Sequence, residues 1–469
     1  MGRAKTPSFV VELELNPTNE DQHQIDKRIK VAINLYNTAL NYSLKRLKAV
    51  LADKEYRLLL KEESTKERNQ RLREIERSYG YSEYQAQAML VPSRKHFKGY
   101  IGGLETQNLA TRAFRAVEKL HYHKAKKVHF KRYNVDEFSI EGKSNASGIK
   151  FRNSKIIWFG LEIPVMINEK NDYVSEALKS RTKYVRLCRK LIRGKYRYYA
   201  QLVQEGYPSQ KDRHYGSEES TVGLDIGPSS LAIVSDDYVD LINLKGPKCD
   251  GYQKEIKRLQ RAMDRSRRAN NPNNYAEGGT VKRGPKAWID SNNYSRLRHR
   301  LNKLYRKLKI NRRNNHEKIA NTIVMLGLDV RVEDLNIQAW QKRAKRTSKN
   351  KRNGKNNRKK RFGKSISNNA PATLLTIIDR KLSYRGLKLK KINTKTCRAS
   401  QYNHIDDTYI KKPLSQRITN VGGHVIQRDI YSAFLIKNTN ETLDKISRSK
   451  CNNEWNNFLD RYEEYNLTV

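Results

Sequence analysis

The sequence predicts an α+β protein of several domains, and its hydrophobic pattern and length support this fold class. Apolar stretches with the period of β-strands occur near the N-terminus and again after residue 220. Stretches with apolar residues at helical spacing lie between and after them. The chain has 469 residues, which suffices for two to four domains. Hydrophobic residues make up only 37% of it, so we expect elongated domains that close around a ligand.

In the N-terminal part, a helical segment interrupts β-like segments. Residues 8–15 predict a strand, and Thr18 with Asp21 resembles a capping box that opens a helix. The chain from about 52 to 130 is polar, rich in Arg and Lys, and helical in pattern. Residues 135–205 return to short β-like stretches. We therefore expect a helical lobe inserted between β segments that pair with each other.

The C-terminal part alternates strands and helices after a polar linker. In order, we expect strands at 221–227, 231–235 and 239–244 in an antiparallel meander, a cationic amphipathic helix in the second half of 254–318, a strand at 328–333, a helix at 373–384, a strand at 387–392 and a last helix from Asp429.

The charge of the chain is strongly positive. Lys and Arg total 96 and Asp and Glu total 49, which gives a net charge of +47. Such an excess repels itself unless a polyanion neutralises it, whereas an ordinary soluble surface mixes both signs. Each phosphate that a cation neutralises releases condensed counterions, so nucleic acid is the expected partner. The 27 Tyr residues add aromatic faces on which bases can stack.

The cysteines and the hydropathy pattern indicate the compartment. The four cysteines, Cys188, Cys249, Cys397 and Cys451, have no paired spacing, which favours a reducing cytosol without disulfides. No apolar stretch approaches membrane-spanning length, and the N-terminus lacks a signal-peptide core. We expect a cytoplasmic protein with no membrane partner.

Three acidic residues stand out in the C-terminal part. Asp225 lies inside an apolar strand, Glu333 ends another, and Asp429 begins the last helix. This order of elements and acids is typical of the ribonuclease H-like fold, in which the three carboxylates converge. Converging carboxylates repel one another unless cations neutralise them, and their hard oxygen atoms suit Mg²⁺ or Mn²⁺. The alternative is that Asp225 caps a turn, Glu333 begins a loop and Asp429 merely caps the start of a helix.

A strongly basic segment follows Glu333. Residues 342–364 hold 13 Lys and Arg and no acid. Such a run is ordinarily a solvated loop. Because it directly follows a candidate catalytic residue, we expect it to contact a phosphate backbone.

At these residues the sequence resembles the TnpB family, proteins of insertion sequences that are relatives of type V CRISPR effectors. The first RuvC motif of the family is similar to Gly-Leu-Asp-Ile-Gly at 223–227, the second to Val-Glu-Asp-Leu-Asn at 332–336, and the third to Arg428-Asp429 with the helix after it. The resemblance covers nearly the whole chain.

The resemblance implies a domain layout and a function. It implies a wedge-like β domain at 1–50 and 131–205 that binds RNA and DNA, a helical recognition lobe at 51–130, a linker at 206–220, a RuvC-like (ribonuclease H-like) nuclease domain at 221–392 and 425–445, a zinc-ribbon-like insert at 393–424, and a tail at 446–469. The implied activity is RNA-guided, metal-dependent cleavage of double-stranded target DNA at a single site with Mg²⁺ or Mn²⁺ held by Asp225, Glu333 and Asp429. Arg428 is implied as a phosphate clamp beside it.

The implied partners are a guide RNA and target DNA, with sequence choice delegated to base pairing. We expect the protein at the nucleoid of a prokaryote, with one or two copies per guide RNA. The sequence does not choose between a monomer and a homodimer.

One departure from the family concerns zinc. The family carries two Cys-x-x-Cys pairs before the final Asp, whereas this chain has only Cys397 there. A closed structural zinc site needs about four ligands. His404 and His424 could contribute, but with a lone cysteine we expect no structural zinc.

Two other functions remain open from the sequence. One is an RNA-guided DNA-binding repressor that does not cut, although such a protein would be expected to have lost acids that this chain keeps. The other is a transposase-associated protein that acts in strand transfer, which would need the same three acids.

Overall fold

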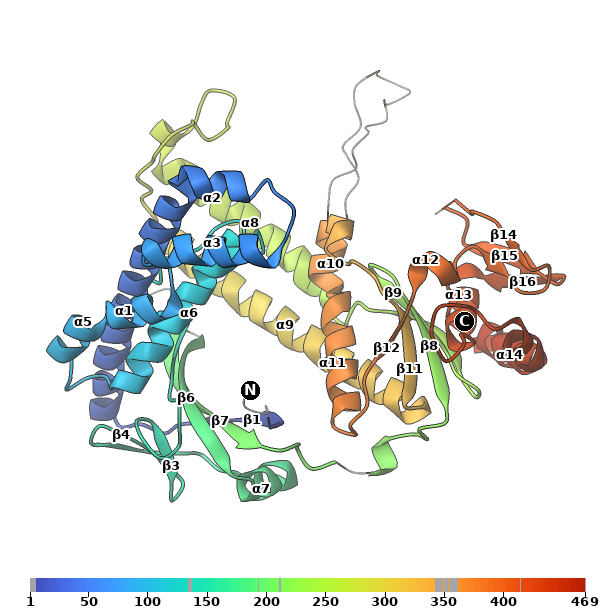
Figure 1. Cartoon of the computed structure of the whole chain (residues 1–469), viewed down its shortest axis with the longest axis horizontal. Helices are drawn as coiled ribbons and strands as arrows, with labels where there is room; N and C mark the ends of the chain where they lie inside the picture. The colour runs from blue at the N-terminus through green and yellow to red at the C-terminus, as the bar shows by residue number, and fades with distance from the viewer. Residues whose placement is uncertain are drawn as a thin grey trace. The chain divides into compact units, whose positions relative to one another are not determined.

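The computed structural model describes residues 6–133, 137–192, 194–210, 212–341, 349, 354, 362–413 and 415–468. The chain forms two compact units, Met1–Ser209 and Gln210–Val469 (Figure 1). Both contain helices and sheets, which confirms the mixed α and β composition expected from the sequence. In the part that the structure describes, we find no helix with the length and apolar character needed to cross a membrane.

Unit 1 is built around an antiparallel sheet in the order β1-β7-β6-β2. Its strands are β1 (Ser8–Glu14), β7 (Lys195–Glu205), β6 (Thr182–Ile192) and β2 (Phe138–Glu141). Alternate residues of β1 are buried because successive side chains of a strand point to opposite faces. The strand at the start of the chain thus pairs with one from the end of the unit.

Helices pack against this sheet and share its core. The long helix α1 (Asn19–Ala52) begins at a capping box, in which Thr18 Oγ1 accepts the Asp21 N–H at 3.1 Å and Asp21 Oδ2 accepts the Thr18 N–H at 2.9 Å. It packs along α6 (Gly103–His121). In the sequence, four shorter helices come between α1 and α6: α2 (Lys54–Leu59), α3 (Lys66–Ser78), α4 (Glu83–Ala88) and α5 (Val91–His96).

Unit 1 also holds a small second sheet with the strands β3 (Lys150–Arg152), β4 (Lys155–Trp158) and β5 (Leu161–Pro164). Asn153 and Ser154, both with positive φ, form the two-residue turn between β3 and β4. Helix α7 (Asp172–Lys179) follows and leads into β6.

Unit 2 contains a mixed five-stranded sheet in the order β10-β9-β8-β11-β12. The strands β8 (Thr221–Ile226), β9 (Ser230–Val234) and β10 (Val239–Asn243) form an antiparallel meander. β11 (Asp329–Glu333) lies parallel to β8, and β12 (Lys390–Ile392) lies parallel to β11. The carboxyl ends of β8 and β11 therefore meet at one edge of the sheet.

Helices cover both faces of this sheet. On one face α9 (Asn292–Leu326) and α11 (Pro371–Ser383) share a core with apolar residues of β8, β9 and β11. On the other face lie α13 (Arg428–Lys437) and α14 (Arg448–Thr468). The structure has two helices in the basic region 254–318. Ile256 and Leu259 of α8 (Cys249–Asn270) pack on the leucine stripe in the first half of α9.

Two short hairpins precede α13. They are β13 (Tyr402–Asn403) with β14 (Thr408–Tyr409), and β15 (Ile418–Val421) with β16 (His424–Gln427). The one-turn helix α12 (Thr394–Cys397) leads into them, and α10 (Gly363–Asn369) precedes α11.

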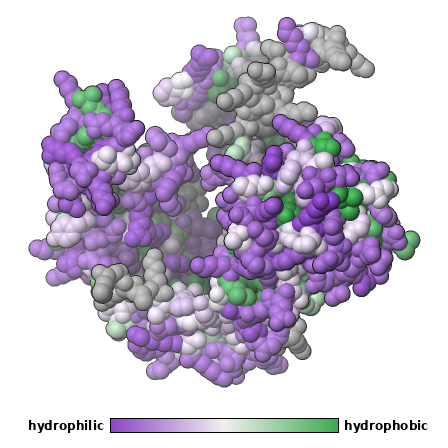
Figure 2. Space-filling view, turned by 45° about the vertical axis from the view of Figure 1, so that its right-hand side comes forward, coloured by the Kyte–Doolittle hydropathy of each residue, from purple (hydrophilic) through white to green (hydrophobic). Residues whose placement is uncertain are grey.

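The basic segment 342–364 lies largely outside the described residues, so its expected phosphate contact stays a prediction. On the face of the molecule in Figure 2, hydrophilic side chains predominate, as the composition requires.

Candidate active site

The three predicted acids lie on three elements of unit 2. Asp225 is on β8, Glu333 ends β11, and Asp429 is in the first turn of α13. Leu224 pairs with Val332 in the parallel register, and Asp225 and Glu333 are the next residues on the two strands. They therefore sit side by side at the carboxyl ends of neighbouring strands.

Both strands direct these acids to the face that α13 covers. Side chains two residues apart on a strand share a face, so Asp225 shares one with Gly223 and Glu333 shares one with Arg331. The Arg331 guanidinium donates hydrogen bonds to the carbonyl oxygens of Lys437 at 3.1 Å and Thr439 at 2.6 Å, at the C-terminal end of α13. This places the same face of β11 against α13.

Gly223 allows α13 to approach β8 closely. A Cβ atom at this position would lie 2.1 Å from the Ala433 carbonyl oxygen and 2.6 Å from the Lys437 nitrogen, both backbone atoms of α13. Neither can move without shifting the helix. The glycine of the Gly-Leu-Asp sequence is thus required by packing, two residues before the acid.

The N-terminus of α13 is fixed by its own cap. Gln427 Oε1 accepts the Ile430 N–H at 2.8 Å, which satisfies one of the free donors of the first turn. Ile430 and Phe434 are buried in the core beneath. The rigid start of the helix holds Asp429 in place at the sheet edge.

The electrostatics indicate that the acids are close together. Burial raises the pKa of the Asp225 carboxyl well above its usual range, and the negative charges of Glu333 and Asp429 raise it further. The Arg428 guanidinium acts in the opposite direction. Burial also raises the pKa of Glu333. Asp225 is therefore the group whose charge the protein itself stabilises least.

Hydrogen bonding does not relieve this charge. Within the described part of the chain, no donor hydrogen bonds to the carboxylate of Asp225 or Glu333. Asp429 differs, because Arg428 Nη2 lies 3.2 Å from its Oδ1 and Arg417 Nη1 lies 3.4 Å from its Oδ2. Two inward-facing carboxylates without partners are an environment that a cation would stabilise.

The donor set fits a hard divalent cation, because it consists of carboxylate oxygens. Among the residues that the structure describes, no three His, Cys, Asp or Glu side chains are arranged to hold a metal ion as they stand. The two arginines on Asp429 occupy the oxygens that it would offer to a metal. Asp225, Glu333 and Asp429 are the residues that would hold Mg²⁺ or Mn²⁺ once Asp429 is released.

Arg428, expected as a phosphate clamp, is engaged within the protein. Its Nη2 atom contacts Asp429, its Nη1 atom donates to the Pro413 carbonyl at 3.3 Å, and its buried Nε atom has no partner among the described residues. Its side chain is largely buried. The clamp role stays a prediction, and it requires Arg428 to leave Asp429.

The segment considered for zinc has a different character. Cys397 is fully buried, and its Sγ atom contacts the Leu443 carbonyl at 3.8 Å. His404 is also fully buried, and its Nδ1 atom lies 2.8 Å from the Tyr431 hydroxyl. The same hydroxyl also accepts the His404 backbone N–H at 3.1 Å.

Aromatic rings enclose the His404 imidazole. The rings of Trp455, Phe434 and Tyr431 have centroids 4.6, 5.7 and 5.9 Å from its own. Burial, with the Arg448 charge, lowers the pKa of His404 to about 4. We call His404, Tyr431, Phe434 and Trp455 the aromatic cluster.

Sequence reasoning did not identify two residues that shape the site. Arg417 precedes β15 and reaches Asp429 only through tertiary folding, so its spacing carried no signal. Gly223 did carry a sequence signal, because a glycine inside an apolar strand often marks a close backbone approach.

Comparison with known proteins gave similarities only to solved structures. No model of a protein family matches the chain, and no curated protein matches it. It is similar to a chain of the cryo-EM structure of the Cas12f1–sgRNA–target DNA complex, with 10% identity, a TM-score of 0.48 and coverage of 93% of this chain and 99% of that chain. It is also similar to a chain of a CRISPR-Cas12f ternary complex, with 13% identity, a TM-score of 0.28 and coverage of 90% and 82%. Both similarities are low, so the function below rests on the residues of this chain.

Proposed function

We propose that the protein is an RNA-guided DNA endonuclease of the TnpB type, which hydrolyses phosphodiester bonds of guide-complementary DNA at a single RuvC-like site. The observation that carries the proposal is the electrostatic state of Asp225. Its charge is opposed by burial and by two other carboxylates, and no described residue donates a hydrogen bond to it. A protein keeps such a group where it has a task, because a buried carboxylate without a partner is unstable.

Each carboxylate has a defined part in the reaction. A bound Mg²⁺ or Mn²⁺ ion would neutralise the acids and stabilise charge on the attacked phosphate. Asp225 and Glu333 supply oxygens from the rigid sheet edge, and Asp429 supplies one from the start of α13. Arg428 and Arg417 neutralise Asp429 in the absence of other cations. When a metal ion takes their place on Asp429, both arginines are free to bind a phosphate of the DNA.

The nucleic-acid partners follow from charge. A net charge of +47 is offset most directly by a long polyanion, and a guide RNA with its target DNA supplies one. The protein would then hold the backbone of the duplex while base pairing selects the sequence.

One observation favours a second candidate, an RNA-guided DNA-binding protein that does not cut. Two guanidinium groups already neutralise Asp429, and no described triad is arranged to hold a metal. If the arginines do not move, Asp429 stays closed to a metal ion, and the protein would bind DNA through its other cations without hydrolysing it. Strand transfer would use the same three acids and is distinguished by its joined DNA products.

Replacing Asp225 tests the proposal. The full chain is purified with its co-purifying RNA, and cleavage of plasmid DNA that matches this RNA is measured in Mg²⁺. Asp225→Ala is expected to lower cleavage by at least about 10³-fold, because metal catalysis contributes several kcal/mol. Binding of RNA and DNA is expected to stay unchanged.

Asp334→Ala is the matched control. Asp334 is the next acid after Glu333, but it is exposed and pairs with Lys391 at 2.9 Å. Full activity of this variant beside an inactive Asp225→Ala supports the proposal. A discrete RNA and specific DNA binding without cutting by the unmodified protein would instead establish the second candidate.

A further inference from the structure

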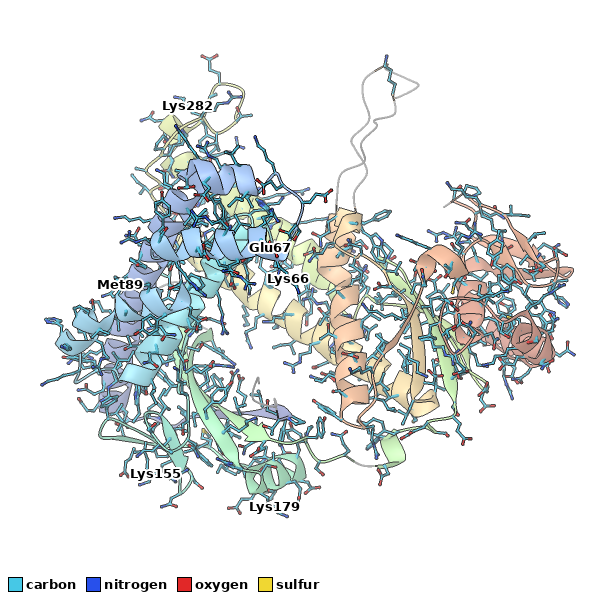
Figure 3. The ribbon with its side chains drawn as sticks, in the orientation of Figure 1. Lys66, Glu67, Met89, Lys155, Lys179 and Lys282 are labelled. Carbon is cyan, nitrogen blue, oxygen red and sulfur yellow. The ribbon has the colours of Figure 1, made fainter. Side chains whose placement is uncertain are left out.

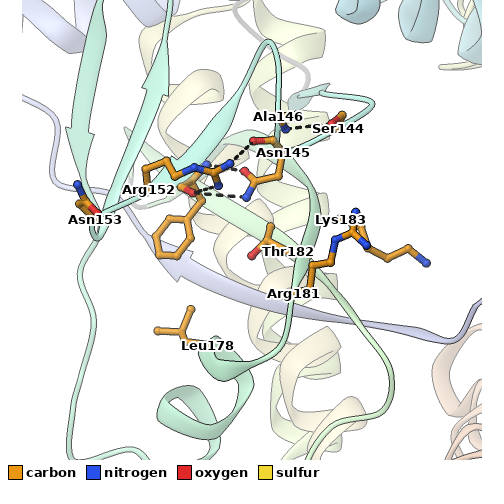
Figure 4. Close-up of a pocket in the computed structure, with 10 residues that line it drawn as sticks. Ser144, Asn145, Ala146, Arg152, Asn153, Leu178, Arg181, Thr182 and Lys183 are labelled. Atoms are coloured by element: carbon orange, nitrogen blue, oxygen red, sulfur yellow. Dashed lines mark hydrogen bonds between the residues drawn. The ribbon is translucent and has the colours of Figure 1, made fainter.

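Unit 1 contains a pocket of about 440 Å³ that the proposed active site does not use. It lies among the β3–β4 hairpin, the segment before it, the end of α7 and the start of β6 (Figure 4). Its volume is within the range of about 300–1,000 Å³ that is typical of pockets for small ligands. The residues that line it are Ser144, Asn145, Ala146, Phe151, Arg152, Asn153, Leu178, Arg181, Thr182 and Lys183.

Three cations and no acid line this pocket. The Arg152 guanidinium donates to two backbone carbonyls, those of Phe151 at 2.9 Å and Asn145 at 3.0 Å, so no carboxylate neutralises it there. Lys183 Nζ donates to the Thr6 hydroxyl at 2.6 Å. The pocket therefore attracts an anion.

Arg181 contributes the third charge. Its nearest carboxylate, that of Glu205, is 3.6 Å away, and the Arg181 side chain is 83% exposed. An ion pair as exposed as this contributes little and is readily exchanged for a stronger anion. A phosphate group is such an anion, since a guanidinium binds it through two parallel hydrogen bonds.

A β-bulge positions Lys183. In the pairing of β6 with β7, Thr182 is opposite Gln204 and Tyr184 is opposite Val203, so Lys183 is the extra residue. Its carbonyl accepts the Asn145 N–H at 2.9 Å, which ties the bulge to the segment before β3. A bulge turns the side chain of its extra residue away from the regular face of the strand. Here the bulged residue lines the pocket beside Arg181.

The aromatic wall of the pocket is held rigidly. Asn145 Oδ1 accepts the Phe151 N–H at 2.7 Å, and Arg152 Nη1 donates to the Phe151 carbonyl (Figure 4). The backbone of Phe151 is thus fixed from both sides. Leu178 at the end of α7 and Ala146 add apolar surface. A wall that is already ordered loses little conformational entropy when a ligand binds.

We propose that this pocket binds one unstacked nucleotide of the RNA that the protein carries. Its base would lie against Phe151 and Leu178, and its phosphate would lie on Arg181 and Lys183. This inference rests on the proposed function, because it takes RNA as the bound polyanion. Single-stranded nucleic acid is held in this way, by stacking on aromatic rings beside a positive surface. A phosphorylated peptide needs the cations alone and leaves the fixed aromatic wall without a use.

Affinity for the RNA tests the inference in the full-length protein. The co-purifying RNA is sequenced, synthesised and titrated into RNA-free protein at moderately high salt, where contacts with phosphate alone are weakened. Phe151→Leu keeps an apolar side chain but removes the aromatic face, and it is expected to weaken binding about tenfold, the scale of one base–aromatic stack. Arg181→Gln, at an exposed position where the fold is not at risk, is expected to weaken it several-fold.

Two lysines of the same unit serve as controls. Lys155 and Lys179, 47% and 71% exposed, come from β4 and α7 but do not line the pocket (Figure 3). Lys155→Gln and Lys179→Gln remove the same charge as Arg181→Gln and are expected to leave affinity nearly unchanged. Ultraviolet cross-linking of the RNA is expected to label the peptide that contains Phe151 in the unmodified protein and not in Phe151→Leu.

The outcomes separate the two proposals. Equal affinities for pocket and control variants, with no cross-link at Phe151, overturn the inference. So does an effect confined to a DNA strand of the same sequence, or to a phosphorylated peptide. If the protein binds RNA through the pocket but cuts no DNA, the inference stands and the nuclease proposal fails. If it binds no RNA at all, both fail.

Discussion

Two regions of unit 2 contain residues of the types that bind metals, and the structure treats them in opposite ways. At the sheet edge, Asp225 and Glu333 face α13 with no hydrogen-bond donor from the described residues. In the aromatic cluster, His404 Nδ1 shares a hydrogen bond with the Tyr431 hydroxyl, and aromatic rings enclose the imidazole. The first region has charge that the described residues leave without a partner, whereas the second is a closed, uncharged core in which the His404 Nε2 atom lacks a hydrogen-bond partner among the described residues. Residue type alone suggests both sites, and unneutralised charge distinguishes them.

The largest expected effect concerns the aromatic cluster. Because the pKa of His404 is lowered to about 4 in the folded protein and is about 6.5 when unfolded, the unfolded state binds the extra proton between these values. The stability that neutral His404 contributes to unit 2 is therefore fully present above pH 6.5 and is lost as the pH drops toward 4. We expect a loss of roughly 3 kcal/mol in the free energy of unfolding.

Denaturant unfolding at several pH values, followed by near-ultraviolet circular dichroism, measures this loss. His404→Phe removes the titrating group but keeps an aromatic ring, and it should flatten the difference between pH 6.5 and 4. If the free energy of unfolding of this variant still falls between pH 6.5 and 4 as in the unmodified protein, His404 is solvated and the aromatic cluster is open to water.

The second prediction concerns the effect of pH and Mn²⁺ on stability through Asp225, which is opposite in sign to the pH effect of His404 in the aromatic cluster. The raised pKa of Asp225 means that the metal-free folded protein loses stability as the pH rises from the unfolded value of about 3.9 through the folded value. A divalent ion binds the deprotonated form, so its affinity rises over the same window. At a Mn²⁺ concentration of 100 times its dissociation constant, we expect a stabilisation of about 2.7 kcal/mol.

Thermal unfolding with and without Mn²⁺ measures this stabilisation. Asp225→Asn should abolish it and should stabilise the metal-free protein at neutral pH, because it removes the opposed charge. A Mn²⁺ effect of full size in Asp225→Asn would place the ion elsewhere.

A third prediction concerns the contact that holds the acids together. Gly223→Ala places a Cβ atom 2.1 Å from the Ala433 carbonyl oxygen and forces α13 away from β8. We expect a destabilisation of about 1–3 kcal/mol or more, with loss of cleavage because Asp429 moves. Gly227→Ala in the same segment meets its nearest atom, Ser230 Oγ, at 3.4 Å and should be close to neutral. Equal stability of the two variants would refute the close packing of α13.

The smallest effect is expected at Arg417. Its pair with Asp429 spans 3.4 Å and its side chain is largely exposed, so it contributes at most about 1 kcal/mol. Arg417→Gln should therefore bind Mn²⁺ up to about fivefold more tightly, because one competing cation is gone. Isothermal titration measures this change. Weaker binding of Mn²⁺ in this variant would mean that Arg417 organises the site instead of blocking it.

Local pattern was sufficient to predict the elements that bear the acids. The apolar run around Asp225, the strand ending at Glu333 and the helix opening at Asp429 have short-range periodicity, and the structure places these residues on β8, at the end of β11 and in the first turn of α13. Thr18 and Asp21 likewise form the expected capping box, because its contacts are local. The catalytic role of the acids remains a proposal.

Features made by tertiary contacts could not be predicted in this way. The pair of Arg417 with Asp429, the enclosure of His404 by Trp455 from a distant helix, and the bulge at Lys183 depend on segments that meet only after folding. The packing of the tail also belongs here, because α14 meets both α13 and β10 in one core.

The late position of α13 and α14 in the sequence matters for the folding of unit 2 during synthesis. The ribosome releases β8 and β11 well before α13, and α13 keeps an apolar surface uncovered until α14 follows it and buries Trp455, Phe458 and Tyr462. The third carboxylate therefore joins Asp225 and Glu333 only after α13 has been made and has packed on β8. A chain arrested before α13 would have most of its Lys and Arg residues for nucleic acid but would lack Asp429.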